Sequence, residues 1–146
     1  MSRRTARKHA FLTLYQSDVT GQPLGPILDR WRRYRGELEE YAEKLSRGVE
    51  KEKEALDRIL DEVALGWPVH RMSVVDRNIL RLALYEMIYV EDVPPEVAIG
   101  EAMELAKGFS GDEAPHFVGG VLRGARESGL LGDSKVNPER RVGYGG

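Results

Sequence analysis

The chain has 146 residues, of which 41% are hydrophobic and 32% are charged, and its formal net charge is −2. This length is typical of one domain with a substantial buried core. The absence of cysteine excludes disulfides and thiolate metal ligands. No apolar run approaches the roughly 20 residues of a membrane span. The N-terminus is charged and lacks the apolar core of a signal peptide, so we expect a cytoplasmic protein.

Apolar residues recur at helical spacing along nearly the whole chain, and no alternating strand pattern is present. The first predicted helix covers residues 3–18, and a Gly- and Pro-rich loop follows at residues 20–26. A short helix lies around residues 27–31. A long helix then covers about residues 38–63, with Gly48 inside it, where a bend or a close helix contact could account for the glycine.

The second half of the chain continues the helical pattern. Ser73 opens a sequence that resembles a capping box, and the next predicted helix runs from about 74 to 90 with apolar residues on most of its circumference. Pro95 suits the first turn of the following helix. The chain breaks again at residues 108–111, and a last apolar stripe covers residues 117–125. The pattern predicts an all-α fold.

The domain organisation that we expect is simple. Residues 1–131 form a single helical domain, and residues 132–146 form a polar, Gly-rich tail that is predicted to be disordered.

The sequence offers little support for catalysis. His9, His70 and His116 do not have the spacing of a helical metal pair, and no HExxH motif or P-loop is present. Ser110 lacks the preceding strand of a nucleophile elbow. We therefore expect no enzyme activity, no cofactor and no metal site.

The first predicted helix is the better functional candidate. It carries cations in pairs one turn apart, namely Arg3 with Arg7 and Arg4 with Lys8. Tyr15 lies further along, at an azimuth close to that of Arg4, Lys8 and Phe11. Cations beside exposed aromatic rings are typical of single-stranded RNA binding, where guanidinium groups hold phosphates and rings stack on bases. The alternative is a solvated helix end with Phe11 and Tyr15 in the core.

Two further clusters are weaker candidates. The first consists of arginines around two aromatic residues: Arg30, Arg32, Arg33 and Arg35 around Trp31 and Tyr34. We interpret it as a solvated flank of a helix whose Trp31 is in the core. The second is near the C-terminus, around a Gly-rich turn: Lys107, Phe109, His116 and Phe117. It could bind a phosphate at a helix start, or its two phenylalanines could simply anchor the turn.

The chain resembles the NusB family of transcription antitermination factors from Arg3 to about Ala125. The similarity rests on five strings in the right order: RRTAR leading into AFLTLYQ at residues 3–16, Trp67 with Arg71 and Met72, VDRNILRLALYE at 75–86, VPPEVAIGEAMELAK at 93–107 and FVGGVL at 117–122. Three positions depart from the family pattern, because Gly100 and Gly119 stand where asparagine is usual and Ala114 stands where serine is common.

The resemblance implies a fold of about seven helices in two small bundles. It implies binding to the single-stranded boxA element of ribosomal RNA leader transcripts, together with the ribosomal protein that doubles as NusE, in an antitermination complex on RNA polymerase. By matching position, it implies an RNA-binding set: Arg3, Arg4, Arg7, Tyr15, Lys107, Phe109, His116 and Phe117. It also places Asp76, Arg77 and Glu86 nearer the protein partner.

Two rival readings stay open at this point. The same fold resembles the N-terminal domain of a ribosomal RNA cytosine methyltransferase family, although residues after Ala125 leave no room for a cofactor-binding α/β domain. The other rival is a helical dimerisation protein whose basic end only increases solubility, and the sequence leaves monomer and homodimer open.

Overall fold

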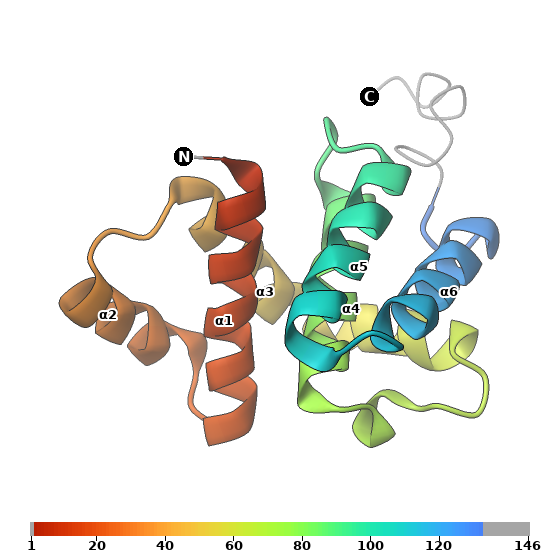
Figure 1. Ribbon diagram of the computed structural model, residues 1–146, viewed down its shortest axis with the longest axis horizontal. Helices are drawn as coiled ribbons and strands as arrows, with labels where there is room; N and C mark the ends of the chain where they lie inside the picture. Colours follow the sequence, from red (N-terminus) through yellow and green to blue (C-terminus); the bar gives the residue numbers. More distant parts are fainter. Residues whose placement is uncertain (1, 133–146) are drawn as a thin grey trace.

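The computed structural model describes residues 2–132, which form six α-helices and one short 3-10 helix (Figure 1). The elements in chain order are α1 (Arg3–Thr20), α2 (Leu24–Arg35), α3 (Glu40–Val63), η1 (Val69–Arg71), α4 (Val74–Tyr89), α5 (Pro95–Ser110) and α6 (Ala114–Glu127). The predicted all-α class is confirmed.

The helices form two bundles that share one continuous core. Figure 1 shows α1 and α2 on one side of the molecule and α4, α5 and α6 on the other. The long helix α3 packs against both α1 and α4, and α1 also packs against α4. The core includes large side chains from both bundles, among them Phe11, Leu28, Leu45, Leu80 and Leu122.

Helix α1 is closed at both ends by local hydrogen bonds. The side chain of Ser2 accepts from the backbone N–H of Thr5, and Gly21 ends the helix in the left-handed conformation, with φ of 74°. Helix α2 begins at Leu24, earlier than predicted. Pro26 does not prevent this because it lies in the first turn, where its missing N–H is not needed. Glu50 of α3 accepts from the backbone N of Leu24 at 2.8 Å.

Gly48 allows α3 to approach α4 closely. A Cβ at this position would lie 2.1 Å from Cζ of Tyr85 on α4, well inside van der Waals contact. Of the two explanations considered for this glycine, the structure supports the close helix contact. The predicted third helix was too long at its N-terminal end, because Leu38 lies in the connection before Glu40.

The predicted boundaries in the second bundle hold with small shifts. Ser73 caps α4 by accepting from the backbone N of Asp76 at 3.0 Å, which confirms the capping interpretation. Gly108 lies inside α5, and the break occurs at Gly111, whose φ is 108°. At Gly119 a Cβ would lie 2.9 Å from Sδ of Met103, so this glycine lets α6 lie close against α5.

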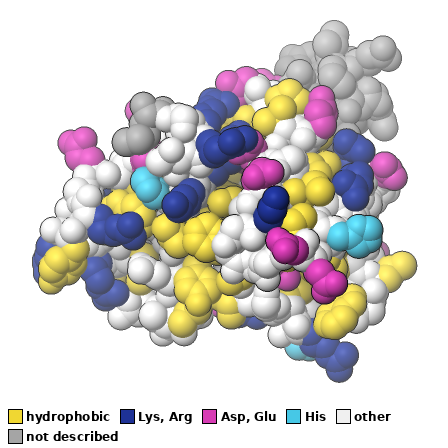
Figure 2. All heavy atoms as spheres, viewed as in Figure 1, with side chains coloured by type: hydrophobic (Ala, Val, Ile, Leu, Met, Phe, Trp, Pro, Cys, Tyr) yellow, Lys and Arg dark blue, Asp and Glu magenta, His cyan; other side chains and the backbone are white. Residues whose placement is uncertain are grey.

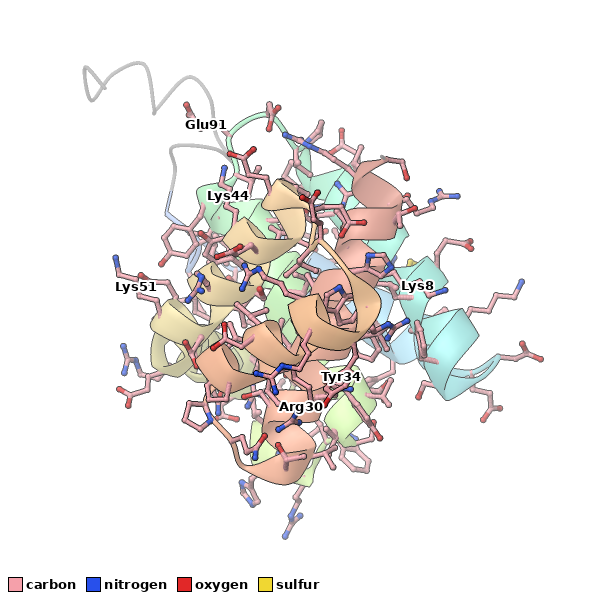
Figure 3. The ribbon with its side chains drawn as sticks, turned by 90° about the vertical axis from the view of Figure 1, so that its left-hand side faces the viewer. Lys8, Arg30, Tyr34, Lys44, Lys51 and Glu91 are labelled. Carbon is pink, nitrogen blue, oxygen red and sulfur yellow. The ribbon has the colours of Figure 1, made fainter. Side chains whose placement is uncertain are left out.

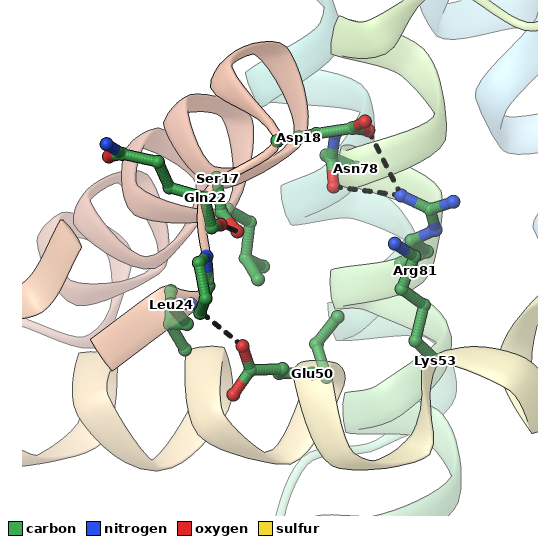
Figure 4. A pocket seen from close by; sticks show the side chains of 12 residues that line it. Ser17, Asp18, Gln22, Leu24, Glu50, Lys53, Asn78 and Arg81 are labelled. Carbon is green, nitrogen blue, oxygen red and sulfur yellow. Dashed lines mark hydrogen bonds and ion pairs between the residues drawn. The ribbon is translucent and has the colours of Figure 1, made fainter. Parts of the chain in front are cut away.

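A polar network joins α1, α3 and α4 beside a pocket of about 390 Å³ (Figure 4). Arg77 donates two hydrogen bonds of 2.7 Å to Asp18, and Asn78 donates to the same carboxylate at 2.8 Å. Arg81 is buried and bridges Asp18 to Asp57. Burial raises the pKa of Asp18, but the hydrogen bonds from Arg77 and Asn78 and the charges of Arg77 and Arg81 outweigh it and lower the pKa to about 2.

The predicted disordered tail falls almost entirely on residues 133–146, outside the described residues. Within residues 2–132, no helix is long and apolar enough to cross a membrane. The same residues contain no group of three or more His, Asp or Glu side chains arranged to hold a metal ion.

Candidate RNA-binding site

The exposed arginines at the start of α1 form ion pairs with acids from the second bundle. Arg4 donates two hydrogen bonds to Glu101 of α5, at 3.0 and 2.8 Å. Arg3 donates to Asp92 at 3.1 Å, and its guanidinium lies 4.3 Å from the ring centroid of Tyr41. The hydrogen bond from Arg4 and the charge of Arg4 lower the pKa of Glu101 despite its partial burial, so this pair is ionised at neutral pH.

The structure places Arg7 and Glu86 in the interior, away from the surface positions that the sequence suggested. Arg7 is 6% exposed and Glu86 is 1% exposed. Nε of Arg7 lies 2.9 Å from both carboxylate oxygens of Glu86, and the hydroxyl of Tyr41 donates to the same carboxylate. Glu101 lies 3.7 Å from the other side of the Arg7 guanidinium. Arg7 therefore links α1 to α4 and helps to position Glu101 and Arg4.

A groove of about 540 Å³ runs between α1 and the C-terminal half of α5. Its charged and aromatic lining consists of the cations Arg4, Arg7 and Lys8, the carboxylates of Glu101 and Glu104, and the ring of Phe109. Arg4 and Lys8 are exposed, and the ring of Phe109 is 39% exposed while it packs on Phe11 with a centroid distance of 4.9 Å. Figure 2 shows Lys and Arg side chains spread over this face, with Asp and Glu side chains among them.

Three other predicted RNA-binding residues lie outside the lining of this groove. Tyr15 is half-buried and packs against Phe11, with ring centroids 6.0 Å apart. Lys107 near the end of α5 and His116 at the start of α6 are both exposed. Exposure leaves both side chains accessible to a ligand.

Phe117 lies in a separate hollow of about 220 Å³ at the start of α4 and α6. Its ring meets Trp67 edge to face, with a centroid distance of 6.4 Å, and Trp67 itself is 54% exposed. Arg71 and Asp76 line the same hollow. Oδ1 of Asp76 is buried and receives no hydrogen bond from the described residues.

Arg77, the remaining residue of the set predicted for the protein partner, follows Asp76 in the chain and forms an ion pair with Asp18. Its side chain is 20% exposed. Of the set predicted for the protein partner, Asp76 thus lies in a hollow, Arg77 belongs to the polar network of α1 and α4, and Glu86 is buried.

Sequence reasoning left several lining residues out of the predicted site. Lys8 was recognisable from its spacing with Arg4, one helical turn apart. Glu101 and Asp92 gave no local signal, because they lie 97 and 89 residues from their arginine partners. Trp67 was noticed only as a family position, and its exposure depends on the fold.

Comparison with known proteins gives one consistent result. The model of the NusB family matches residues 4–127. The transcription antitermination protein NusB of Rubrobacter xylanophilus is 69% identical over 137 residues, which cover 92% of this chain and 99% of that protein. The protein of the same name from Thermobifida fusca is 42% identical over 123 residues, covering 83% and 86% of the two chains.

Solved structures agree with this assignment. A structure of T. maritima NusB is 35% identical, has a TM-score of 0.78 and covers 87% of this chain and 92% of its own. A chain in a crystal structure of the antitermination factors NusB and NusE with double-stranded RNA is 29% identical. Its TM-score is 0.78, with coverage of 86% and 96%. The predicted resemblance is confirmed, and the chain belongs to the NusB family.

Proposed function

We propose that this protein is a cytoplasmic transcription antitermination factor that binds boxA RNA together with NusE and performs no chemical step. The observation that carries the proposal is the groove between α1 and α5, where the exposed ring of Phe109 lies among the cations Arg4 and Lys8. Residues 1–131 form the RNA-binding domain in this account.

The groove offers the two kinds of contact that a single strand needs. Lys8 in the groove and Lys107 outside its lining are exposed cations that can hold phosphates. Arg4 is 72% exposed at its side chain and keeps free N–H groups beyond its two bonds to Glu101. Phe109 provides a partly exposed ring on which a base can stack. The half-buried Tyr15, which packs on Phe11, and the exposed His116 are the other members of the proposed contact area.

Arg3 and Arg7 have different roles in this proposal. Arg7 is a positioning residue, because its guanidinium is buried between Glu86 and Glu101. Arg3 lies beside a hollow lined by several acids, namely Glu37, Glu39, Glu40 and Glu43. Arg3 is also paired with Asp92, whereas within residues 2–132 no ion pair joins Lys8 to a carboxylate, so Arg3 contributes less to RNA affinity than Lys8.

The hollow at Trp67 and Phe117 fits the protein partner better than the RNA. An apolar side chain of a partner could pack on the two rings, and Arg71 and Asp76 in the same hollow add charged groups of both signs. We therefore propose that NusE contacts this hollow, with Arg77 at its margin. With NusE in this hollow, the α1–α5 groove remains available to RNA. The complex of this protein with NusE would then join the antitermination complex on RNA polymerase.

A filter-binding titration of boxA RNA against a scrambled RNA of equal length, with and without NusE, tests the proposal. We expect preference for boxA, and a stronger preference when NusE is present. Lys8→Gln should weaken binding about threefold, whereas Lys51→Gln, an exposed cation on α3, should have no effect. Equal binding of the two RNAs in the presence of NusE would contradict the proposed function. Gel filtration of the free protein would separately detect a homodimer.

A further inference from the structure

The outer side of α2 carries arginines that keep their charge available. The buried side of this helix is formed by Leu24, Ile27, Leu28 and Trp31. Arg30, Arg33 and Tyr34 are spaced three and four residues apart, so they lie together on the opposite side. All three are exposed, and Tyr34 is 73% exposed. Figure 3 shows Arg30 and Tyr34 close together on this side.

The partners of these arginines differ from those of α1. Arg30 donates to the neutral side chain of Gln22 at 3.2 Å. Arg35 lies over the ring of Trp31, 4.3 Å from its centroid. Among residues 2–132, no ion pair joins Arg30, Arg33 or Arg35 to a carboxylate, whereas Arg32 pairs with Glu43 and Asp29. Arg30 and Arg33 on the outer side and Arg35 at the C-terminal end of α2 therefore outnumber the exposed acid of this helix, Asp29.

Ring contacts connect the neighbour of Lys8 on α1 with the C-terminal end of α2. Lys8 lines the groove, and the next residue, His9, places its ring 4.9 Å from that of Trp31. Arg35 covers the same Trp31 ring. Glu39 accepts a hydrogen bond from His9, but its side chain is only 11% exposed, so this carboxylate is largely hidden from a ligand. The contacts thus run from His9 through the buried Trp31 to Arg35 at the C-terminal end of α2.

We propose that the exposed arginines of α2 form a second RNA-contact surface, in which Arg30 and Arg33 on the outer side and Arg35 at the C-terminal end bind single-stranded nucleotides flanking boxA. Tyr34 supplies a ring for base stacking. The inference rests on the proposed function, because it extends the path of the same RNA strand. Such contacts are made with phosphates and with the faces of bases, which every sequence offers. They therefore increase RNA affinity without adding sequence preference.

Fluorescence anisotropy with three RNAs tests the inference: bare boxA, boxA with eight uridines on its 5′ side and boxA with eight on its 3′ side. The wild-type protein should bind one flanked RNA roughly fivefold more tightly than bare boxA. The variant Arg30→Gln/Arg33→Gln should bind bare boxA normally and lose this gain. On the flanked RNA its log–log salt slope should be smaller by about 1.4, or 0.7 for each lost phosphate contact.

The control Lys51→Gln/Lys53→Gln removes two exposed cations of α3 and should keep the gain. Circular dichroism melting checks that both double variants are folded. If the α2 variant keeps the full gain, or if neither flank strengthens wild-type binding, the inference is overturned although boxA preference remains. If wild-type protein with NusE does not distinguish boxA from scrambled RNA, the proposed function itself fails.

Discussion

The arginines of α1 and those of α2 are equally conspicuous in the sequence but differ in the folded protein. Each of Arg3, Arg4 and Arg7 lies within 4 Å of a carboxylate from the second bundle. On α2, Arg32 is paired in this way, while Arg30 and Arg33 keep their charge exposed to solvent. A cluster of cations thus indicates a polyanion site only after its carboxylate partners are known, because paired charges attract phosphates less strongly.

The largest effect that we expect separates structural from RNA-binding arginines. Arg7→Ala should lower the free energy of unfolding by about 3–5 kcal/mol, because it removes the cation that is hydrogen-bonded to the buried carboxylate of Glu86. Urea denaturation measures this loss. Lys8→Ala, at an exposed position one residue away, is the matched control and should change stability by less than about 0.5 kcal/mol. A similar small loss for both variants would show that Arg7 is not a structural residue.

The paired carboxylate of Asp18 should give a pH-dependent stability. Its pKa is about 2 in the folded protein against an ordinary 3.8, so its ion pairs stabilise the protein above about pH 4 and are lost as the pH falls toward 2. After allowance for solvent screening, we expect the wild type to lose about 1–2 kcal/mol over this range. In urea titrations, the free energy of unfolding of Asp18→Asn should fall less than that of the wild type over the same pH range. Identical acid profiles would refute the assignment.

Releasing Arg4 from its acid partner should strengthen RNA binding. In Glu101→Gln the charge of Arg4 is no longer neutralised, so boxA affinity should rise roughly threefold and the salt slope should steepen by up to about 0.7. Anisotropy titrations from low to moderate salt measure both quantities. Glu96→Gln, which removes an exposed acid from the first turn of α5, controls for the change in net charge. Equal gains in both variants would indicate a general charge effect.

The smallest effect concerns the paired arginine of α2. Arg32→Gln should leave RNA affinity and the salt slope unchanged within error, because Glu43 and Asp29 already neutralise this side chain. Its stability should fall by no more than about 0.5 kcal/mol, as for an exposed ion pair. A loss of affinity equal to that of Arg33→Gln would contradict the distinction between paired and unpaired arginines.

The local sequence predicted the helices well because their determinants are local. The cap at Ser73, the proline at the start of α5 and the apolar spacing of α4 act within a few residues. The observed helix limits differ from the predicted ones where one residue type fits two structures. Pro26 was assigned to a loop, but proline is also tolerated in a first helical turn, and it lies in the first turn of α2. The family resemblance supplied the two-bundle arrangement, which apolar spacing alone does not determine.

The candidate site was less predictable because its electrostatics depend on residues distant in the chain. Nothing near Arg7 shows that Glu86, 79 residues later, would bury it. The separation of Phe109 from Phe117 into two hollows likewise depends on how α5 and α6 pack. Residue type and spacing identified the cationic face, and the tertiary fold determined which cations remain exposed.

The most direct test of this account is the log–log salt dependence of boxA binding for Lys8→Gln and Arg3→Gln, measured side by side in the presence of NusE. We expect Lys8→Gln to reduce the slope by about 0.7, the value for one phosphate contact on a single strand. Arg3→Gln should reduce it by less than half as much, because Arg3 is paired with Asp92 beside an acidic hollow. A full reduction for Arg3→Gln with no change for Lys8→Gln would contradict the account.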